Sequence, residues 1–206
     1  MPIKRENQCY NCSNHRRFLN KINETQFLFN KTPLPKSNNL AIFALKSQNM
    51  KQRILFVCLG NICRSPAAEA MMQTLVDRAG LHDEIYLDSA GTYGGHAGER
   101  ADARMRRAAA ARGIDITHRS RQVREEDFER FDMVIAMDDN NYEALFRLAP
   151  SREAQFKIFR FREFLRRHPD WSYIPDPYYE GHEGFELVLD LLEDGCATLL
   201  SEIGQK

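Results

Sequence analysis

The pattern of hydrophobic and polar positions after residue 50 alternates between short apolar runs and longer amphipathic stretches. The short runs occupy residues 53–57, 85–87, 132–137 and 156–159. Continuous apolar runs of this length, rich in β-branched residues, are typical of strands that are buried on both faces of a sheet. The sequence therefore predicts four strands of a parallel sheet that is covered by helices.

An amphipathic helix is expected after the first run, with Ser65 as its N-cap, Pro66 in the first helical position and Gly80 at its C-terminal end. Further helices are expected over residues 101–112, 140–148 and 184–203. Gly195 lies inside the last of these and is expected to weaken it by about 1 kcal/mol relative to alanine. Alternating strands and helices predict an α/β fold, with an open, twisted four-stranded parallel sheet flanked by helices on both faces.

Residues 1–49 differ from the rest of the chain in composition. They contain eight basic residues, two acidic residues and nine asparagines, and their short apolar islands show no helical or strand period. Such a segment buries too little apolar area to offset the entropy of ordering it. We expect residues 1–49 to be a flexible or disordered N-terminal extension and residues 50–206 to be the folded domain. The extension lacks an amphipathic helix and a signal-type apolar core, which disfavours a targeting role.

The chain as a whole is neutral, with 29 Lys and Arg against 29 Asp and Glu among 206 residues. This balance disfavours an electrostatic nucleic-acid binder, which normally has a large basic surplus. The sequence has no uninterrupted apolar run of about 18 residues, which excludes a transmembrane helix. Its five cysteines lack the regular spacing of a disulfide framework and indicate a reducing compartment. We expect a cytoplasmic protein that binds neither nucleic acid nor membrane.

Residues 57–66 read V-C-L-G-N-I-C-R-S-P and join the first predicted strand to the first predicted helix, at the edge of the sheet where ligands bind. Gly60 and Asn61 are able to take positive φ, so successive backbone N–H groups can converge on an anion. The helix N-terminus reinforces the site, and the guanidinium of Arg64 matches two phosphate oxygens. Cys58 lies at the base of this positive field, which favours its thiolate as a nucleophile. The predicted phosphate-binding residues are Leu59, Gly60, Asn61, Ile62, Cys63 and Arg64.

The spacing Cys-x5-Arg-Ser is shared by cysteine-dependent phosphatases, and the string C-L-G-N-I-C-R-S-P resembles the low-molecular-weight protein tyrosine phosphatase family of bacterial type. The resemblance covers residues 50–206. It includes D-S-A-G-T at 88–92, G-I-D-I-T-H at 113–118, R-Q-V at 121–123, M-D-D-N-N at 137–141 and D-P-Y-Y at 176–179. It implies the Rossmann-like phosphatase I fold and the hydrolysis of phosphotyrosine and small aryl phosphates through a phosphocysteine intermediate. No cofactor and no metal take part in that mechanism.

The chemistry of a tyrosine phosphate needs a proton donor in addition to the thiolate. The tyrosine hydroxyl has an ordinary pKa of about 10, so its phenolate departs slowly unless it is protonated in the transition state. Asp176, which precedes the rigid Pro177, is the candidate general acid on a separate loop. After transfer of the phosphoryl group to Cys58, the same carboxylate can activate the water that hydrolyses the phosphocysteine.

The resemblance also implies supporting residues around the loop. In the family, the side chain of the loop asparagine, here Asn61, is held by a serine and a histidine, here Ser89 and His118. Ser65, directly after the loop arginine, helps the thiolate to leave in the second step.

Tyr178 and Tyr179 resemble the pair that lines the entrance to the active site in the family. Many members, especially bacterial ones, also place a tryptophan in the loop after the D-S-A-G-T segment. This chain has Gly95 near that position and Tyr93 two residues earlier. Either Tyr93 takes over the role in the substrate cleft or the cleft is more open, and both alternatives stand.

Cys63 resembles the second loop cysteine of the family, which traps the nucleophile, here Cys58, as a reversible disulfide under oxidation. The nearest alternative function is thiol-dependent arsenate reduction on the same scaffold, which passes oxidation to further cysteines. The chain has no cysteine between Cys63 and Cys196, which disfavours such a relay. A non-catalytic phosphate-binding module is expected to lack the nucleophile, the arginine or the acid, and all three are present.

Other polar residues are expected to have no part in the chemistry. Arg121 either lines the entrance or is solvated, and we favour the second interpretation. Cys196, on an apolar helix face, is interpreted as part of the core. Cys9 and Cys12, with His15 nearby, have no second cysteine pair at zinc-finger spacing, so no metal site is predicted. The expected partner is a phosphotyrosine protein, for which family analogy suggests a bacterial tyrosine kinase or a polysaccharide-export regulator. The expected state is a monomer.

Overall fold

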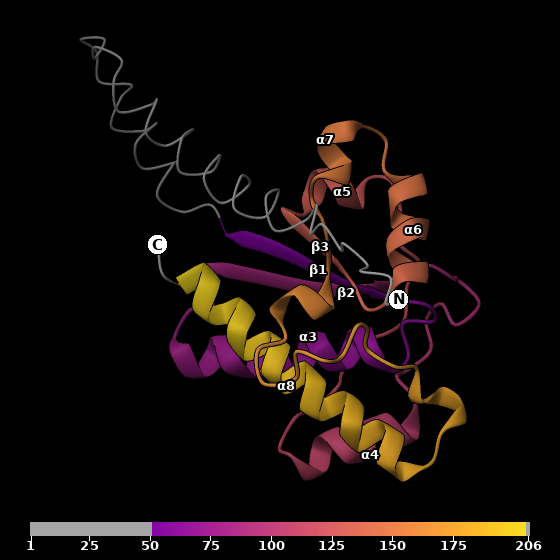
Figure 1. The fold of residues 1–206 in the computed structure, drawn as a ribbon, viewed down its shortest axis with the longest axis vertical. Helices are drawn as coiled ribbons and strands as arrows, with labels where there is room; N and C mark the ends of the chain where they lie inside the picture. The colour runs from indigo at the N-terminus through magenta and orange to yellow at the C-terminus, as the bar shows by residue number, and fades with distance from the viewer. Residues whose placement is uncertain (1–50, 205–206) are drawn as a thin grey trace, which may run out of the picture. The chain divides into compact units, whose positions relative to one another are not determined.

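The computed structural model describes residues 51–204, and the expectations for residues 1–49, including Cys9, Cys12 and His15, lie outside this range. Figure 1 shows a central sheet with helices on both sides. The strands are β1 (Gln52–Cys58), β2 (Ile85–Gly91), β3 (Met133–Ala136) and β4 (Ile158–Arg160). The helices are α3 (Arg64–Ala79), α4 (Ala103–Ala111), α5 (Asp127–Arg130), α6 (Asp139–Leu148), α7 (Arg152–Gln155) and α8 (His182–Gly204), with the 3₁₀ helices η1 (Phe161–Phe164) and η2 (Pro177–Tyr179).

All four strands run parallel, in the order β2-β1-β3-β4. Strand β1 is central, since Leu55 pairs with Asp88 of β2 on one side and with Val134 of β3 on the other. Helices α3 and α8 pack on one face of the sheet with α4 beside them, and α5, α6 and α7 lie on the other face (Figure 1). This arrangement confirms the predicted fold class.

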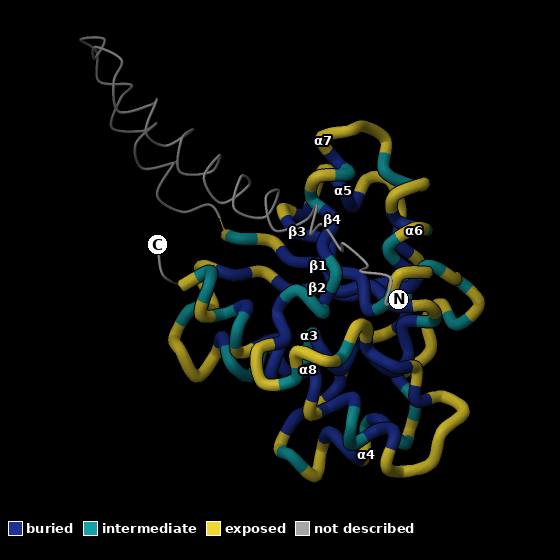
Figure 2. The backbone as a smooth tube through the Cα atoms, in the orientation of Figure 1, coloured by how far each residue is buried: buried dark blue, intermediate teal, exposed yellow. Residues whose placement is uncertain are grey.

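The core has one layer on each face of the sheet, and Figure 2 shows the strands buried between them. Leu55 and Val57 of β1 belong to a buried cluster on the side of α5, α6 and α7, together with Phe128, Phe131, Leu145 and Ala154. On the other face, the ring of Phe56 lies 6.2 Å from the ring of Phe161 in η1. Because both faces of β1 are buried, its apolar run shows no alternation.

Helix α3 begins two residues earlier than the sequence predicted. Its N-cap is Cys63, which makes no side-chain cap hydrogen bond. The assignment of Ser65 as the N-cap was wrong because its hydroxyl serves the loop instead: it lies 3.1 Å from Cys58 Sγ and donates to the carbonyl of Ala90 at 3.2 Å. The helix ends as predicted at Gly80, whose φ of 71° favours glycine.

The fourth strand is shorter than the apolar run that predicted it. Phe156 is the C-cap residue of α7 and is half exposed, so β4 begins at Ile158. The strand lies at the edge of the sheet and pairs only with β3 among the described strands.

Gly195 lies inside α8, where the sequence predicted a weak point. A Cβ at this position would overlap the ring of Phe161. The glycine therefore lets η1 pack directly against α8, which gives it a packing role that helix propensity alone does not predict.

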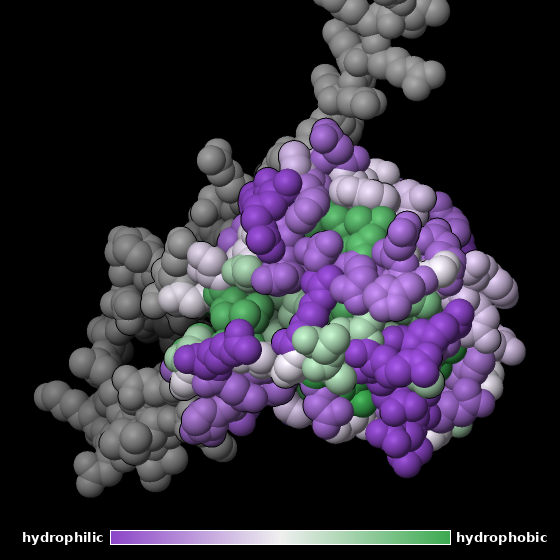
Figure 3. All heavy atoms as spheres, turned by 90° about the horizontal axis from the view of Figure 1, so that it is seen from below, coloured by the Kyte–Doolittle hydropathy of each residue, from purple (hydrophilic) through white to green (hydrophobic). Residues whose placement is uncertain are grey.

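The surface carries no extended apolar face in the view of Figure 3. Hydrophilic side chains cover most of the described surface in this view, and hydrophobic ones form separate small areas. Within residues 51–204, no helix combines the length and the apolar character that a membrane span requires.

Candidate active site

The loop between β1 and α3 turns its carbonyl groups toward neighbouring segments. These carbonyls accept hydrogen bonds from Thr92 N–H and Tyr93 N–H after β2, from the hydroxyl of Ser120 and from Asp102 N–H before α4. Among the described residues, no acceptor faces the N–H groups of residues 59–63. These N–H groups and the N-terminus of α3 are therefore available to an anion.

The backbone of the loop depends on two residues with special steric properties. Asn61 has a φ of 54°, whereas Gly60, which was also able to take this conformation, does not adopt a positive φ. A Cβ on Gly91, at the end of β2, would lie 2.6 Å from the carbonyl oxygen of Leu59. Glycine at this point of the D-S-A-G-T segment therefore allows the loop to approach β2 closely.

The amide of Asn61 is the centre of a buried network. Its Nδ2 donates to Ser65 Oγ and to Ser89 Oγ, both at 2.9 Å. Its Oδ1 lies 3.0 Å from His118 Nε2 and accepts the backbone N–H of Arg121 at 2.9 Å. The structure thus brings together the asparagine, both serines and the histidine that the sequence singled out. Because Asn61 is fully buried, these bonds hold the left-handed residue of the loop in place.

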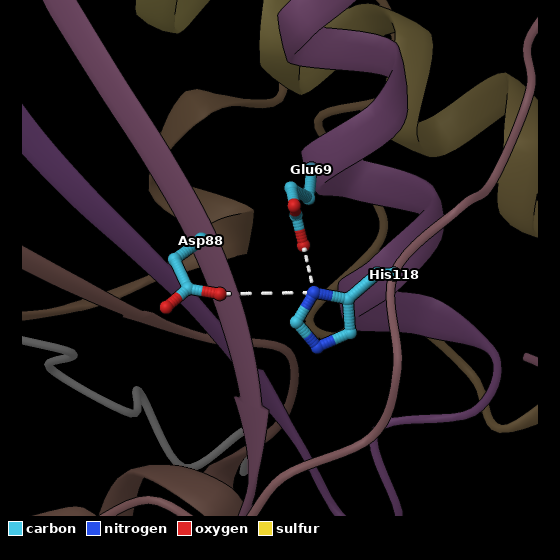
Figure 4. Close-up of side chains that lie close together, drawn as sticks. All are labelled: Glu69, Asp88 and His118. Atoms are coloured by element: carbon cyan, nitrogen blue, oxygen red, sulfur yellow. Dashed lines mark ion pairs between the residues drawn. The ribbon is translucent and has the colours of Figure 1, made fainter. Parts of the chain in front are cut away.

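Two carboxylates that sequence reasoning missed surround His118 (Figure 4). His118 Nδ1 lies 3.0 Å from Glu69 Oε2 and 3.7 Å from Asp88 Oδ1. Glu69 Oε2 also accepts the hydroxyl of Ser89 at 2.6 Å. The sequence held a signal for Glu69, since it follows Ser65 by four residues and therefore lies on the same helix face. The two carboxylates orient the imidazole that contacts the loop.

Glu69, Asp88 and His118 offer ligand atoms within 4.8 Å of one another, a spacing that suits a metal ion. These atoms already contact one another, and Ser89 and Arg121 bind the carboxylates as well. We therefore interpret the three residues as support for the loop, through the contacts of His118 and Ser89 with Asn61.

The interpretation of Arg121 as a solvated residue was wrong. Its guanidinium contacts Asp88 Oδ2 at 2.8 Å and Asp127 Oδ2 at 2.9 Å. Burial acts to lower the pKa of Arg121, but the hydrogen bond to Asp127 and the charge of Asp88 outweigh it and raise the pKa above its usual value. The prediction failed because Asp88 is 33 residues away in the sequence, and Asp127 comes close only through the turn that precedes α5.

Cys58 and Arg64 lie at the two ends of the loop. Cys58 is 2% exposed at the end of β1, and Arg64, the first residue of α3, is 3% exposed. Burial acts to lower the pKa of Arg64, but Cys58 and the carboxylates of Asp176 and Asp138 raise it, so the guanidinium stays charged. Arg64 Nε has no hydrogen-bond partner among the described residues. A buried, charged donor without an acceptor suits an anionic ligand.

The rest of the Arg64 guanidinium is held by two carboxylates and a carbonyl. Nη1 donates to Asp138 Oδ2 at 2.6 Å and to the carbonyl of Ile174 at 3.1 Å, and Nη2 donates to Asp176 Oδ2 at 2.6 Å. Sequence reasoning missed Asp138, which is also the N-cap of α6 within the M-D-D-N-N segment. The N-cap position gave a signal for its structural role but none for its contact with Arg64.

Asp176 directly precedes Pro177 and is the N-cap of η2. Its Oδ1 accepts the N–H of Tyr178 at 3.2 Å, and its side chain is 40% exposed. A carboxylate oxygen thus lies where the guanidinium of Arg64 would otherwise receive an oxyanion. The candidate acid and the candidate phosphate-binding residue are in direct contact.

Exposed tyrosines lie on the segments next to the loop and to Asp176. Tyr93, Tyr178 and Tyr179 are all exposed, and the rings of Tyr178 and Tyr179 pack edge to face at 5.0 Å. A Cβ on Gly95 would overlap the ring of Tyr93, so that ring occupies the space where a larger residue 95 would begin. His96, which sequence reasoning did not assign, lies beside the loop, with Cδ2 3.2 Å from the place of a Cβ on Gly60.

The two remaining described cysteines are buried thiols. Burial, the nearby Asp102 and the charge of Cys58 raise the pKa of Cys63, so it stays protonated at neutral pH. Burial also raises the pKa of Cys196, whose Sγ lies 3.7 Å from the carbonyl of Ala68. The prediction that Cys196 belongs to the core is confirmed.

Comparison with known proteins places this geometry in a family. The model of the low molecular weight phosphotyrosine protein phosphatase family matches residues 53–206. A putative low molecular weight protein-tyrosine-phosphatase of Synechocystis sp. is 44% identical over 154 residues, which are 75% of this chain and 98% of that protein. A low molecular weight protein-tyrosine-phosphatase of Streptomyces coelicolor is 40% identical over 158 residues, 76% and 96% of the two chains.

The fold agrees with these relatives. A crystal structure of a protein tyrosine phosphatase from Entamoeba histolytica, with Hepes in the active site, has a TM-score of 0.73 and 42% identity. The match covers 75% of this chain and 98% of that one. The range 53–206 that the family model matches contains Cys58, Arg64 and the loop between them, the residues that support the loop, and Asp176. The chain therefore belongs to the low molecular weight phosphotyrosine protein phosphatase family and is a cysteine-dependent protein-tyrosine-phosphatase that acts on phosphoproteins.

Proposed function

We propose that Cys58 is the nucleophile of this phosphatase, Arg64 its phosphate-binding residue and Asp176 its general acid and base. The observation that carries this assignment is the environment of Arg64. It is a buried, charged guanidinium with one unpartnered N–H, beside a loop whose N–H groups 59–63 have no acceptor among the described residues. A bound phosphate would satisfy these donors together, because a helix N-terminus and a guanidinium both favour oxyanions.

In the first step, Cys58 Sγ attacks phosphorus and the bond from phosphorus to the tyrosine oxygen breaks. Asp176, in its protonated form, gives its proton to the leaving phenolate, which departs as neutral tyrosine. The electron pair of the thiolate forms the sulfur–phosphorus bond of a phosphocysteine. The loop N–H groups and Arg64 bind the three equatorial oxygens while their charge changes.

In the second step, water attacks the phosphocysteine and Asp176 takes a proton from it. The sulfur–phosphorus bond breaks, its electron pair returns to Cys58, and inorganic phosphate leaves. The hydroxyl of Ser65 lies 3.1 Å from Cys58 Sγ, at a distance from which it stabilises the departing thiolate. Asp176 thereby regains the proton that it gave up in the first step.

Substrate binding requires a rearrangement at Arg64. The phosphate and the carboxylate of Asp176 compete for the same guanidinium, which Asp176 contacts at 2.6 Å. An arriving phosphate therefore displaces Asp176, which moves it toward the leaving oxygen and places it in an anionic environment.

The supporting residues keep the loop in its anion-binding shape. Asn61 is joined to Ser65, Ser89 and His118, and its φ of 54° is costly without such support. We assign these residues to positioning, because none of them needs to contact the substrate.

The exposed rings at the entrance suit a flat aromatic substrate. We assign Tyr178 and Tyr179 to one side of the cleft and Tyr93 to the other, with Gly95 leaving room for the ring of Tyr93. Stacked aromatic contacts of this kind favour phosphotyrosine over the short phosphoserine side chain. The phosphoprotein substrate is then a phosphotyrosine protein, and family analogy indicates a bacterial tyrosine kinase.

The family match over residues 53–206 supports residues 50–206 as the phosphatase domain. We place this protein in the cytoplasm as a monomer, which is consistent with thiol chemistry in a reducing compartment. Arsenate reduction is not favoured. The described cysteines other than Cys58 are Cys63 and Cys196, and both are buried thiols of raised pKa, so a relay of reactive thiols lacks its parts.

The test is hydrolysis of p-nitrophenyl phosphate and of a phosphotyrosine peptide in the presence of a metal chelator. Wild-type protein is expected to hydrolyse both, Cys58→Ser to be inactive while folded, and the core control Cys196→Ala to stay active. Asp176→Ala is expected to slow phenyl phosphate by about 10²-fold and 2,4-dinitrophenyl phosphate far less. Turnover by Cys58→Ser, or arsenate reduction faster than phosphate hydrolysis in a parallel assay, would contradict the assignment.

A further inference from the structure

Arg104, the second residue of α4, donates three hydrogen bonds to the residue that caps this helix. Its backbone N–H, its Nε and its Nη2 all donate to the carboxylate of Asp102, at 2.7, 3.1 and 2.8 Å. Asp102 is the N-cap of α4, and the hydrogen bond from the Arg104 side chain is the main cause that lowers its pKa. The pair therefore stays charged at neutral pH, and the guanidinium is fixed relative to the start of the helix.

Asp102 is itself joined to the phosphate loop. Its N–H donates to the carbonyl of Ile62 at 2.7 Å. The N-cap of α4 is thus anchored on the loop, and Arg104, held by that N-cap, keeps a fixed position relative to the loop.

On its other side, the guanidinium of Arg104 lies over two aromatic rings. Its Cζ is 4.9 Å from the ring centroid of Phe185 and 5.3 Å from that of Tyr178. Phe185 is buried in α8 and gives a fixed support, whereas Tyr178 is partly exposed and also packs edge to face on Tyr179. A guanidinium over the face of a ring attracts it electrostatically. Arg104 therefore restrains the position of Tyr178.

The backbone of Tyr178 is in direct contact with the proposed general acid, Asp176. Its backbone N–H donates to Asp176 Oδ1 at 3.2 Å, within the short turn of η2. The other carboxylate oxygen of Asp176 contacts Arg64, and a bound phosphate would replace that contact. The link through Tyr178 is then the one that still orients the carboxylate.

We infer that Arg104 is a positioning residue of the reaction, which sets the place of Asp176 relative to the phosphate loop through Tyr178. The series of contacts runs from the loop carbonyl of Ile62 through Asp102 and Arg104 to the turn that carries the acid. Arg104 itself touches no reacting atom. The inference rests on the proposed role of Asp176 and adds to it the residue that determines where this acid lies during proton transfer.

The first test compares Arg104→Gln with Arg107→Gln, a control on the same helix whose side chain is exposed and has no ion pair among the described residues. We expect Arg104→Gln to lower kcat/KM for phenyl phosphate about tenfold and for 2,4-dinitrophenyl phosphate less than about twofold, because only the poor leaving group needs the acid. Inhibition by vanadate should not change, since the anion-binding loop is intact. Arg104→Lys, which keeps the charge but loses the fork to Asp102, should give an intermediate loss.

The second test repeats Arg104→Gln in the Asp176→Ala protein. If Arg104 acts through Asp176, the second substitution should add less than about twofold with phenyl phosphate. The inference would be overturned if the two losses multiply in the double variant. It would also be overturned if Arg104→Gln slows all leaving groups equally or weakens inhibition by vanadate. A wild-type protein whose rate does not depend on Asp176 at all would instead contradict the proposed role of the acid, so the two failures are distinguishable.

Discussion

The phosphate loop and the segment that carries the general acid are held by the fold in different ways. Asn61, in the middle of the loop, is fully buried, and its amide makes four hydrogen bonds. Asp176 is 40% exposed, and its carboxylate is held by Arg64 and by one N–H of the following turn. One contact of the acid is therefore with the group that must release it when phosphate binds.

This difference matches what each region has to do. Donors that stabilise a transition state work best when they are fixed before the substrate arrives, because they then need no reorganisation during the reaction. A group that first gives a proton to a leaving oxygen and then takes one from water gains from a segment that can adjust. The comparison predicts that substitutions in the loop affect every substrate, whereas those near the acid act selectively or on stability.

The largest effect is expected from Arg64→Lys. Lysine keeps the charge but not the planar fork, so the unpartnered Nε and the two held nitrogens have no equivalent. We expect kcat/KM to fall by about 10³-fold for all aryl phosphates, with a parallel loss of vanadate inhibition. Arg107→Lys on the exposed side of α4 is the control, and a loss restricted to poor leaving groups would contradict a role in phosphate binding.

A smaller effect is expected when the hydrogen bonds of the Asn61 side chain are removed. Asn61→Gly keeps access to positive φ but loses all four hydrogen bonds of the amide. Because misplacement of about 1 Å can cost about 10²-fold, we expect kcat/KM to fall by up to that factor for good and poor leaving groups alike. Asn61→Ala should be worse still, since alanine disfavours this φ. Full activity of Asn61→Gly would show that the network is not needed.

The segment before the general acid has a buried anchor, and its removal should affect stability more than chemistry. Asp194 in α8 is 2% exposed and accepts the N–H groups of Arg166, Arg167 and His168 at 2.8–3.1 Å, as well as His168 Nδ1. We expect Asp194→Asn to lower the free energy of unfolding by about 2 kcal/mol, because buried donors lose their partner. Urea unfolding measures this, with the exposed Asp190→Asn on the same helix as a control.

The same anchor predicts a dependence on pH. Burial alone would raise the pKa of Asp194, but the hydrogen bonds from His168 and from the three backbone N–H groups outweigh it and hold the pKa below its ordinary value. Its contribution to stability is therefore present above the unfolded pKa of about 3.9 and is lost as the pH falls through the lower folded pKa. Below about pH 4, the free energy of unfolding should therefore fall less in Asp194→Asn than in the wild-type protein. An acid unfolding transition that is the same in both proteins would refute this.

The smallest effect is expected at the entrance. Gly95→Ala introduces a Cβ into the space of the Tyr93 ring, which has to move. Since an aromatic contact contributes about 0.5–1.5 kcal/mol, we expect KM for a phosphotyrosine peptide to rise about three- to tenfold with kcat unchanged. Gly181→Ala, which meets no neighbour within 4 Å, is the matched control. A change in kcat rather than KM would place Tyr93 outside the cleft.

Much of the fold was predictable because its signals are local. The first three apolar runs and the stop at Gly80 depend on neighbouring residues, and the structure confirms them, whereas β4 is shorter than the run that predicted it. The start of α3 was predicted wrongly, since the usual preference of serine for the N-cap is overridden when its hydroxyl binds Cys58 and Ala90. The hydrogen bond from Ser65 to the carbonyl of Ala90 in β2 therefore decided the role of this serine against its local preference.

The candidate site divides in the same way. The nucleophile, the loop and the phosphate-binding arginine lie within seven residues, so one contiguous motif was enough to propose them. The partners of Arg64 are 74 and 110 residues away at Asp138 and Ile174, and no pattern in the sequence linked them. The carboxylates around His118 were missed for the same reason, apart from the helical spacing of Glu69.

The sequence by itself determined the phosphate loop, because the conformation of a short strand–loop–helix segment depends on steric and hydrogen-bonding preferences of adjacent residues. Only the tertiary structure decided which groups hold that loop and place the acid, namely the network at Asn61, the ion pairs of Arg121 and the contact of Arg104 with Tyr178. The physical reason is that partners of buried charges and of exposed rings are chosen by packing of distant segments, which local preferences do not encode.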